Sequence, residues 1–372
     1  MQSIVRKWPV RIFPAILMMS VLALQSAPTG ASLPRSPRSS DVHAGAVSCA
    51  NSTVCTLVGA PVDGSGAVIL RTTDGGSTWH RQSPPAGISG LTAVSCPTTK
   101  FCLATGGGPS TFTVATTSDG GITWIGKAGV GVSSWIDAVD CLTPTNCYAE
   151  GFAEGWAKGM SGLALLRSRN AGTTWSLLVF PAGGNTASST TRASLSCPST
   201  VVCYTVRPVG NLSTFDVFTT MNGGSTGKTV LKGEDAAPHS PIGIACWLPT
   251  ACMVTGAYRG SRVLVTANGG KSWTTYKLPA VDVNGVGVQC LGARRCVVIA
   301  ETHSGFGAAL TANAGIRWST SAVATVQSPT ADEFIGMSCI AAGTCRAMLQ
   351  TRTTSIYSSI DGGHAWQKAH LP

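Results

Sequence analysis

Thr72-Thr73-Asp74-Gly75-Gly76-Ser77-Thr78-Trp79 is one of seven copies of the same phrase in this chain of 372 residues. Each copy has an Asp or Asn followed by one or two Gly, and six of the seven copies end on a Trp. The Asp or Asn positions are 45 to 52 residues apart. A repeat of this length is typical of a β-propeller or a solenoid. The other six copies are centred on Asp119, Asn170, Asn222, Asn268, Asn313 and Asp361.

The fourteen cysteines follow the same period and form seven Cys-x5-Cys pairs, with none left over. In an exported protein such a set indicates disulfides, and the match to the repeat predicts one bond within each repeat, at the tip of a hairpin. Zinc would require two pairs from different repeats to meet, or a recurring His. None of the six His recurs with the cysteines, so we expect no metal site. The pairs are Cys49/Cys55, Cys96/Cys102, Cys141/Cys147, Cys197/Cys203, Cys246/Cys252, Cys290/Cys296 and Cys339/Cys345.

The N-terminus is predicted to be a signal peptide, residues 1–31. Three basic residues precede an apolar run, residues 12–27, and small residues surround a cleavage position after Ala31. An uncleaved membrane anchor is the alternative, but the run contains Pro14 and is shorter than the roughly 20 residues of a spanning helix. We expect residues 32–43 to be a disordered lead-in. The mature chain is predicted to be secreted or held at the cell envelope.

Composition favours an all-β chain without nucleic-acid binding. Only 11% of residues are charged and 44 are Gly, which suits short strands joined by tight turns. The net charge is +10, and three of the positive charges lie in the signal segment, which leaves +7 on the mature chain. These charges are scattered, with no basic and aromatic arrangement for nucleic acid. No second apolar span follows, so we expect no membrane span after signal cleavage. We also expect a monomer without a cofactor.

The second repeat shows the expected blade, with strands over residues 91–96, 101–105, 111–117 and 122–126. Four such strands, designated A to D, form one antiparallel blade, and residues 44–372 form a seven-bladed β-propeller. In the repeated phrase we expect the Asp or Asn side chain to bind the backbone two residues on, and the Gly residues to adopt positive φ. The Trp is expected to pack between neighbouring blades. Asn in four copies argues against a calcium site.

Two features concern the ring as a whole. The fourth repeat has Gly227 where the others have Trp, which predicts either a looser blade or a contact that has no place for a ring. The first repeat begins on strand A and the seventh ends on strand D, so closure requires no strand shared between the first and last blades.

The chain resembles exported propellers of the Asp-box type, also called BNR repeats, over roughly residues 44–370. The box is shared with sialidases and other glycoside hydrolases, while a single body of seven repeats after a signal peptide is more similar to photosystem II assembly factor-like propellers. The resemblance implies the fold and little about activity. The Arg-Ile-Pro phrase of sialidases is absent from the first mature repeat, and no Tyr matches their nucleophile by motif.

The strand order predicts two different faces. The A–B hairpins with their disulfides and the C–D turns share one face, which we name the disulfide face. The B–C and D–A segments share the other, the loop face, and these segments vary between repeats. Variable loops on a rigid frame commonly carry binding residues. The candidate ligand-binding residues on the loop face are Trp135, Glu154, Trp156, Arg207, Tyr258, Arg259, Arg262, His303, Asp332, Glu333 and Arg352.

Two functions remain open at this stage. The first is a secreted, non-catalytic binding or scaffold module for an extracellular or envelope protein, or for a polysaccharide. The second is an Asp-box glycoside hydrolase, sialidase-like or otherwise exo-acting, which would require two carboxylates about 5–10 Å apart and facing the substrate. The sequence identifies no catalytic residue.

Overall fold

Contacts divide the chain into two units, Met1–Ser36 and Pro37–Pro372, and the described strands belong to the second. The predicted signal peptide, and residues 32–41 of the predicted lead-in, lie outside the described residues. The prediction of disorder was wrong for residues 42 and 43, which pair with the next strand of the first blade. The computed structural model describes residues 42–107, 112–128, 134–156, 160–181, 194–209, 214–235, 243–257, 262–279, 285–302, 305–325, 333–340, 342–350, 354–369 and 371.

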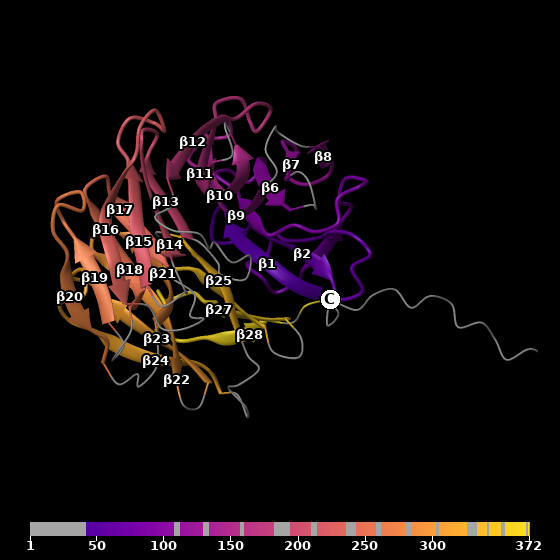
Figure 1. Ribbon diagram of the computed structural model, residues 1–372. Coiled ribbons are helices and arrows are strands. Elements are labelled where there is room, and N and C mark those ends of the chain that lie inside the picture. The colour runs from indigo at the N-terminus through magenta and orange to yellow at the C-terminus, as the bar shows by residue number, and fades with distance from the viewer. Residues whose placement is uncertain are drawn as a thin grey trace, which may run out of the picture. The chain divides into compact units, whose positions relative to one another are not determined.

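The second unit consists of seven four-stranded antiparallel sheets, each built from four consecutive strands (Figure 1). The prediction of an all-β, seven-bladed propeller is confirmed. The blades are β1 (Val42–Cys49) to β4 (His80–Gln82), with β2 (Cys55–Pro61) and β3 (Val68–Thr72); β5 (Ala93–Ser95), β6 (Cys102–Gly106), β7 (Thr113–Thr117) and β8 (Ile125–Ala128); β9 (Ser134–Cys141), β10 (Cys147–Trp156), β11 (Met160–Ser168) and β12 (Ser176–Pro181); β13 (Ser194–Ser199), β14 (Val202–Val209), β15 (Thr214–Thr220) and β16 (Lys228–Asp235); β17 (Ile244–Leu248), β18 (Ala251–Ala257), β19 (Arg262–Thr266) and β20 (Thr274–Lys277); β21 (Gly285–Gly292), β22 (Arg295–Thr302), β23 (Gly305–Thr311) and β24 (Ser319–Thr325); and β25 (Glu333–Cys339), β26 (Cys345–Gln350), β27 (Thr354–Ser359) and β28 (Gln367–Ala369).

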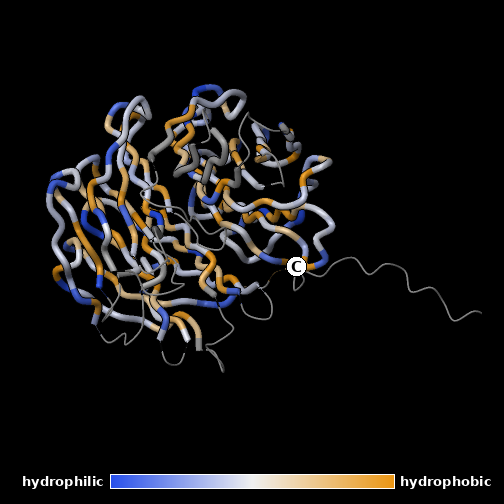
Figure 2. The backbone as a smooth tube through the Cα atoms, viewed as in Figure 1, coloured by the Kyte–Doolittle hydropathy of each residue, from blue (hydrophilic) through white to orange (hydrophobic). Residues whose placement is uncertain are grey.

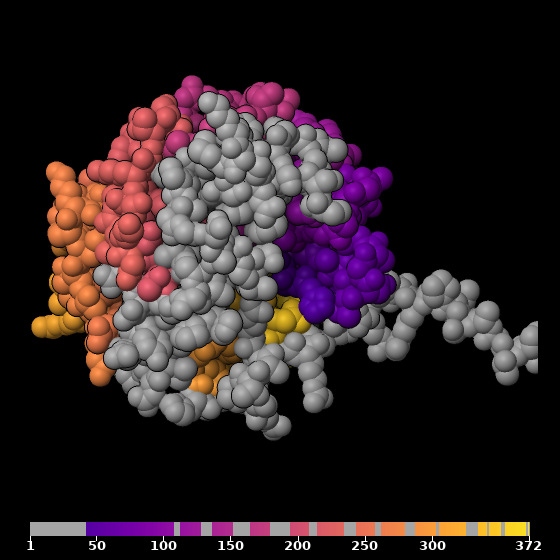
Figure 3. All heavy atoms as spheres, viewed as in Figure 1, coloured from indigo at the N-terminus to yellow at the C-terminus, as the bar shows by residue number. Residues whose placement is uncertain are grey.

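The first strands of the blades form the inner ring. Each packs against the first strand of the next blade, from β1 through β5, β9, β13, β17 and β21 to β25, and β25 packs against β1. The blades follow one another in chain order, so that the last strands lie beside the first (Figures 1 and 3). No strand is shared between the first and seventh sheets, as expected.

All seven disulfides are present, one in each blade, and no described cysteine is free. In the first blade Cys49 and Cys55 are opposite each other in the register of β1 and β2. The C–D turn of the same blade rests on this hairpin, because the Gly75 amide donates to the Thr53 carbonyl at 2.9 Å. An equivalent bond recurs in every blade, which confirms that disulfides and C–D turns share a face. The other donors are Gly120, Ala171, Gly223, Gly269, Ala314 and Gly362.

The second cysteine of each pair is deeply buried. The second cysteine of every pair is at most 1% exposed, and each belongs to one of the seven apolar clusters described below. The paired cysteines flank the five residues of the hairpin turn, as predicted, and the second cysteine lies at or next to the start of strand B, where its side chain packs into the core. The seven buried residues are Cys55, Cys102, Cys147, Cys203, Cys252, Cys296 and Cys345.

Each C–D turn is closed by side chains of its own repeat. In the first blade Thr72 Oγ1 donates to Asp74 Oδ1 at 2.7 Å and accepts from the Gly76 amide at 2.8 Å. Asp74 Oδ1 also accepts from the Thr78 amide at 2.9 Å, four residues on. The prediction of a bond two residues on was therefore wrong, because the turn is longer than an Asx turn. Gly75 and Gly76 adopt φ of 75° and 89°, as predicted.

The apolar core lies between blades, where apolar strand segments face each other (Figure 2). Seven clusters of buried residues each join two neighbouring blades. In six of them the Trp after the C–D turn packs against the preceding blade, as predicted. Trp124, for example, donates from Nε1 to Gln82 Oε1 of the first blade at 2.9 Å. Among the described residues the third and fourth blades share the smallest cluster, and it has no Trp.

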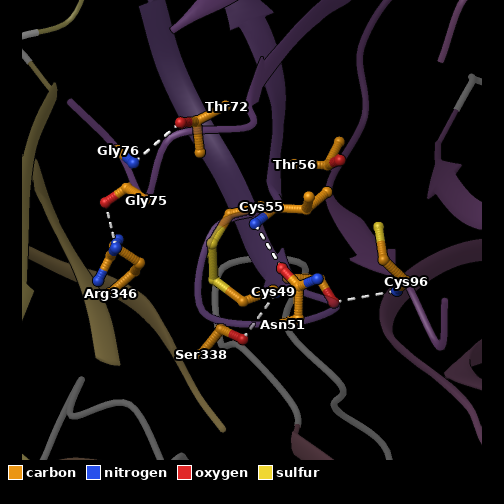
Figure 4. Close-up of a disulfide and its surroundings, with 12 residues drawn as sticks. Cys49, Asn51, Cys55, Thr56, Thr72, Gly75, Gly76, Cys96, Ser338 and Arg346 are labelled. Carbon is orange, nitrogen blue, oxygen red and sulfur yellow. Dashed lines mark hydrogen bonds between the residues drawn. A yellow bond between two sulfur atoms is a disulfide. The ribbon is translucent and has the colours of Figure 1, made fainter. Parts of the chain in front are cut away.

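A belt of hydrogen bonds joins the inner strands. At five of the seven boundaries, the side chain of the residue before the first cysteine of one blade accepts from the amide of the corresponding cysteine in the next blade. The last bond of the belt closes the ring, since the Cys49 amide donates to Ser338 Oγ at 3.0 Å (Figure 4). Arg346 of the seventh blade also donates to the Gly75 carbonyl across the same boundary. The other belt bonds are Cys96 to Ser48, Cys141 to Ser95, Cys197 to Asp140 and Cys246 to Ser196.

Removing the disulfide of the seventh blade should lower stability. By the chain-entropy estimate, the double variant Cys339→Ser/Cys345→Ser loses about 2 kcal/mol, because the bond closes a short loop. Differential scanning calorimetry would detect a fall in melting temperature. Cys290→Ser/Cys296→Ser is the matched control away from the closure. An unchanged melting temperature in the Cys339/Cys345 variant would contradict a role for this disulfide in closing the ring.

Candidate functional site

A charged cluster lies in the boundary between the third and fourth blades. Arg207, expected among exposed loop residues, is in β14 and is only 4% exposed. Its Nε donates to Glu150 Oε1 at 2.9 Å, and its terminal nitrogen NH2 donates to Asp137 Oδ2 at 2.7 Å. Glu150 in β10 is completely buried, while the Asp137 side chain in β9 is 17% exposed. We name Asp137, Glu150 and Arg207 the charged triad.

The triad stands out once the repeats are aligned on their cysteines. Glu150 lies three residues after the second cysteine of its repeat, and Arg207 lies four residues after the second cysteine of the next. The other repeats have uncharged residues at both positions, so the two charges could have been found by this alignment. The residues at the Glu150 position are Val58, Thr105, Val206, Thr255, Ile299 and Met348, and those at the Arg207 position are Gly59, Gly106, Gly151, Gly256, Ala300 and Leu349.

Burial dominates the electrostatics of Glu150. It raises the pKa of this carboxyl above its ordinary value; the Arg207 guanidinium opposes the shift, and the negative charge of Asp137 adds to it. One oxygen of Glu150, Oε2, has no hydrogen-bond partner within the described part of the chain. The triad thus combines a tightly bound arginine with an incompletely satisfied buried carboxyl group.

Polar contacts replace the missing Trp at the same boundary. Tyr148 donates from its hydroxyl to the Thr200 carbonyl of the fourth blade at 2.8 Å. Arg167 lies over the Tyr148 ring at 5.2 Å and donates to the carbonyls of Thr200 and Gly223, both at 2.9 Å. The boundary thus has polar contacts around the Tyr148 ring and the smallest apolar cluster, and the two outcomes predicted for the repeat with Gly227 stay predictions.

Asp140 is a second unusual acid near the triad. It occupies the belt position at which four other blades have Ser, and its Oδ2 accepts from the Cys197 amide at 2.8 Å. Burial raises the pKa of Asp140 to about 6, and this hydrogen bond partly opposes the shift. Asp140 is not among the predicted site residues, although an alignment of the Ser-Cys dipeptides would have shown it as the exception.

The remaining candidates fall into three groups. Arg262 is exposed at the start of β19. Trp135 in β9 and residues Glu154 and Trp156 in β10 share the loop end of one hairpin, with Trp135 opposite Phe152 in the register, and Glu333 begins β25. The candidates that lie outside the described residues are Tyr258, Arg259, His303, Asp332 and Arg352.

Two features are absent from the described residues. These residues contain no group of three or more His, Cys, Asp or Glu that could hold a metal ion. None of their elements is a helix long and apolar enough to cross a membrane.

No protein-family model matches the chain, and no curated protein matches it in sequence. Solved structures do match. One described as "YCF48 bound to D1 peptide" has a TM-score of 0.58 at 15% identity, over 87% of this chain and 95% of that chain. The β-propeller domain of the Trilobed protease from Pyrococcus furiosus, which has an open velcro topology, matches with a TM-score of 0.56 at 8% identity. The match covers 88% of this chain and 95% of that chain. The six-bladed Aleuria aurantia lectin, described as recognising fucose, matches with a TM-score of 0.51 at 11% identity. The match covers 89% of this chain and 96% of that chain. At these identities the similarity establishes the fold.

Proposed function

We propose that this chain is an exported, non-catalytic binding or scaffold module whose loop face holds a segment of an extracellular or envelope protein, or a polysaccharide. The observation that carries the proposal is the contrast between the two faces. On the disulfide face, every blade has the same cysteine separation and the same bond between hairpin and turn. On the loop face, the connections range from residues 303–304 to residues 182–193. A rigid frame with variable loops is the usual arrangement of a binding surface.

The similar structures support a binding role. By its description, the YCF48 structure holds a D1 peptide, and the Aleuria lectin recognises fucose. Both ligand classes are compatible with a loop face that has Trp, Arg and Glu candidates, because aromatic rings stack on sugars and apolar side chains while Arg binds carboxylates. The Asp-box resemblance to photosystem II assembly factor-like propellers favours the peptide.

The charged triad weighs against the glycoside hydrolase. Asp137 and Glu150 are close, since both bind the same nitrogen of Arg207, at 2.7 and 2.8 Å. A glycosidase needs two carboxyl groups that face the sugar from opposite sides of the bond. Glu150 is completely buried, and both carboxyl groups are bound to the Arg207 guanidinium. The raised pKa of Glu150 is the one feature that a hydrolase would share, so a turnover assay belongs in the test.

A thermal-shift screen tests the proposal. The exported protein would be screened against sialosides, fucosides, wall oligosaccharides and peptides from an envelope extract. A ligand at 100 times its Kd should raise the melting temperature by about 5 °C. We expect Trp156→Ala and Arg259→Ala on the loop face to abolish this shift.

Arg317→Ala, an exposed arginine on the disulfide face, is the matched control and should retain the shift. Loss of the shift in this control alone would place the ligand on the wrong face and contradict the proposal. Release of sugar from a bound ligand would show that the protein is a glycoside hydrolase and not a non-catalytic binding module.

A further inference from the structure

The disulfide face has most of the exposed large apolar side chains of the described residues. Eight large apolar residues are exposed in the described part of the chain, and six of them lie in the hairpins and C–D turns of this face. Ile122 and Ile360 are 84% and 81% exposed. Exposed apolar groups concentrated on one face indicate an interaction surface. The six residues are Ile122, Val201, Met221, Leu248, Ile316 and Ile360.

The turn geometry does not require these side chains. Each C–D turn has two tip positions, the residue before the Asp or Asn and the residue three after it. In the first blade Thr73 and Ser77 occupy them, and the turn forms in the same way. In each of the other six blades, at least one tip position has a large apolar or cationic residue. These tip residues are Ile122, Arg169, Met221, Lys271, Ile316 and Ile360.

The same face is rich in cations and poor in acids. The segments between the paired cysteines contain no Asp or Glu in any of the seven repeats. The C–D turns contribute three acids, Asp74, Asp119 and Asp361, and each accepts hydrogen bonds within its own turn. The exposed cations of the hairpins and turns are Lys100, Arg169, Lys271, Arg294, Arg295 and Arg317.

From this combination we infer that the disulfide face docks on a lipid bilayer containing anionic phospholipids. Apolar tips flanked by Lys and Arg are the chemistry of peripheral membrane binding, in which apolar side chains enter the headgroup region and cations bind lipid phosphates. An anionic polymer would explain the cations but not the exposed isoleucines. The tips belong to turns that are fixed on disulfide hairpins in every blade, so they form a rigid set with little entropy to lose on docking.

Docking by this face goes beyond the proposed loop-face function and does not depend on it. The B–C and D–A segments lie at the other ends of the strands, where acids such as Asp63 also occur. A bilayer under the disulfide face would leave the loop face directed away from the membrane. The two surfaces can therefore be tested by separate variants.

Vesicle co-sedimentation tests the inference on the exported protein, with its N-terminus identified by mass spectrometry because an uncleaved apolar segment would bind lipid by itself. Vesicles of phosphatidylcholine alone would be compared with vesicles containing about 30% phosphatidylglycerol. We expect binding to the anionic vesicles only, weakened by raising the salt from about 0.05 to about 0.5 M.

Two variants use residues that other repeats have at the same turn positions, so the turns should be retained. Ile122→Ser/Ile316→Ser/Ile360→Thr removes apolar tips, and Arg169→Ser/Lys271→Ser/Arg317→Thr removes cations. Each should lower the partition coefficient about tenfold or more. Val62→Ser is the matched control, since Val62 is 56% exposed beyond β2 toward the loop face.

Three results would overturn the inference. The first is equal binding to both vesicle types. The second is loss of binding in Val62→Ser as large as in the isoleucine variant. The third is loss in the cation variant alone together with displacement by soluble polyphosphate, which would identify an anionic polymer as the partner. Melting temperatures within about 2 °C of wild type would show that the variants are folded.

Discussion

Arg207→Met should be among the most destabilising single substitutions in the propeller. It leaves Glu150 completely buried with its cationic partner removed, and breaking a buried ion pair in this way costs about 3–5 kcal/mol. Replacing both partners, as in Glu150→Leu/Arg207→Met, should restore stability to within about 1–2 kcal/mol of wild type, because both fully buried charges are removed and the Asp137 side chain, 17% exposed, keeps access to water. Urea denaturation followed by Trp fluorescence measures both.

The effect of Arg207→Met should depend on pH in a defined direction. Burial already raises the folded-state pKa of Glu150, and removing the guanidinium raises it further. An acid whose pKa is raised in the folded state destabilises the fold as pH rises through that pKa. The loss should therefore be larger at pH 8 than at pH 5. Arg262→Met removes an exposed arginine and should change stability by less than about 0.5 kcal/mol at both pH values. A similarly small effect of Arg207→Met at pH 8 would show that the triad does not hold the third and fourth blades together.

Asp140→Ser should stabilise the protein at neutral pH. The variant installs the residue that four other blades have at this belt position, retains an acceptor for the Cys197 amide and removes a charge. The unfolded carboxyl titrates near 3.8 and the folded one at about 6, a difference worth about 2–3 kcal/mol. The gain should be complete above pH 6, decline between pH 6 and 4, and vanish below pH 4, where Asp140 is protonated in both states.

Thermal unfolding of Asp140→Ser across this pH range, beside Ser196→Ala, measures the effect. Ser196 accepts the next belt bond, and its removal should cost about 1 kcal/mol without a pH dependence in this range. A destabilised Asp140→Ser at pH 7.5 would indicate that the charge of Asp140 is compensated and that the residue serves a binding role in the native protein.

The sequence predicted the architecture because the signals that define a blade are local. Cys49 and Cys55 are separated by six positions, and Thr72, Asp74 and Thr78 close a turn within seven residues. Such contacts form within one hairpin or turn whatever the rest of the chain does. Seven repetitions then fix the number of blades, and the invariant strand order fixes which ends share a face. The same locality explains why the seven disulfide pairs were predicted correctly.

The burial of the cysteines, by contrast, followed from the ring. A disulfide in an isolated hairpin would be open to water on both sides of the sheet. In the propeller the cysteines near the start of each strand B, such as Cys203, Cys252 and Cys296, belong to an apolar cluster shared with a neighbouring blade. The spacing of the cysteines specifies their pairing, and the packing of the blades specifies their environment.

The charged triad, the belt and the ring closure depended on the tertiary structure. Arg207 meets Asp137 across 70 residues and Glu150 across 57, and Cys49 meets Ser338 across 289. These partners come from different repeats, and the spacing along the chain does not specify which side chains of adjacent blades will face each other. Only the packing of one blade on the next places Glu150 and Arg207 in a single desolvated boundary, where the cost of burying each charge alone makes the pairing necessary. Local sequence signals therefore specify the structure of each blade and the number of blades. The closed ring decides which side chains of neighbouring blades meet, because their contacts join residues far apart in the chain.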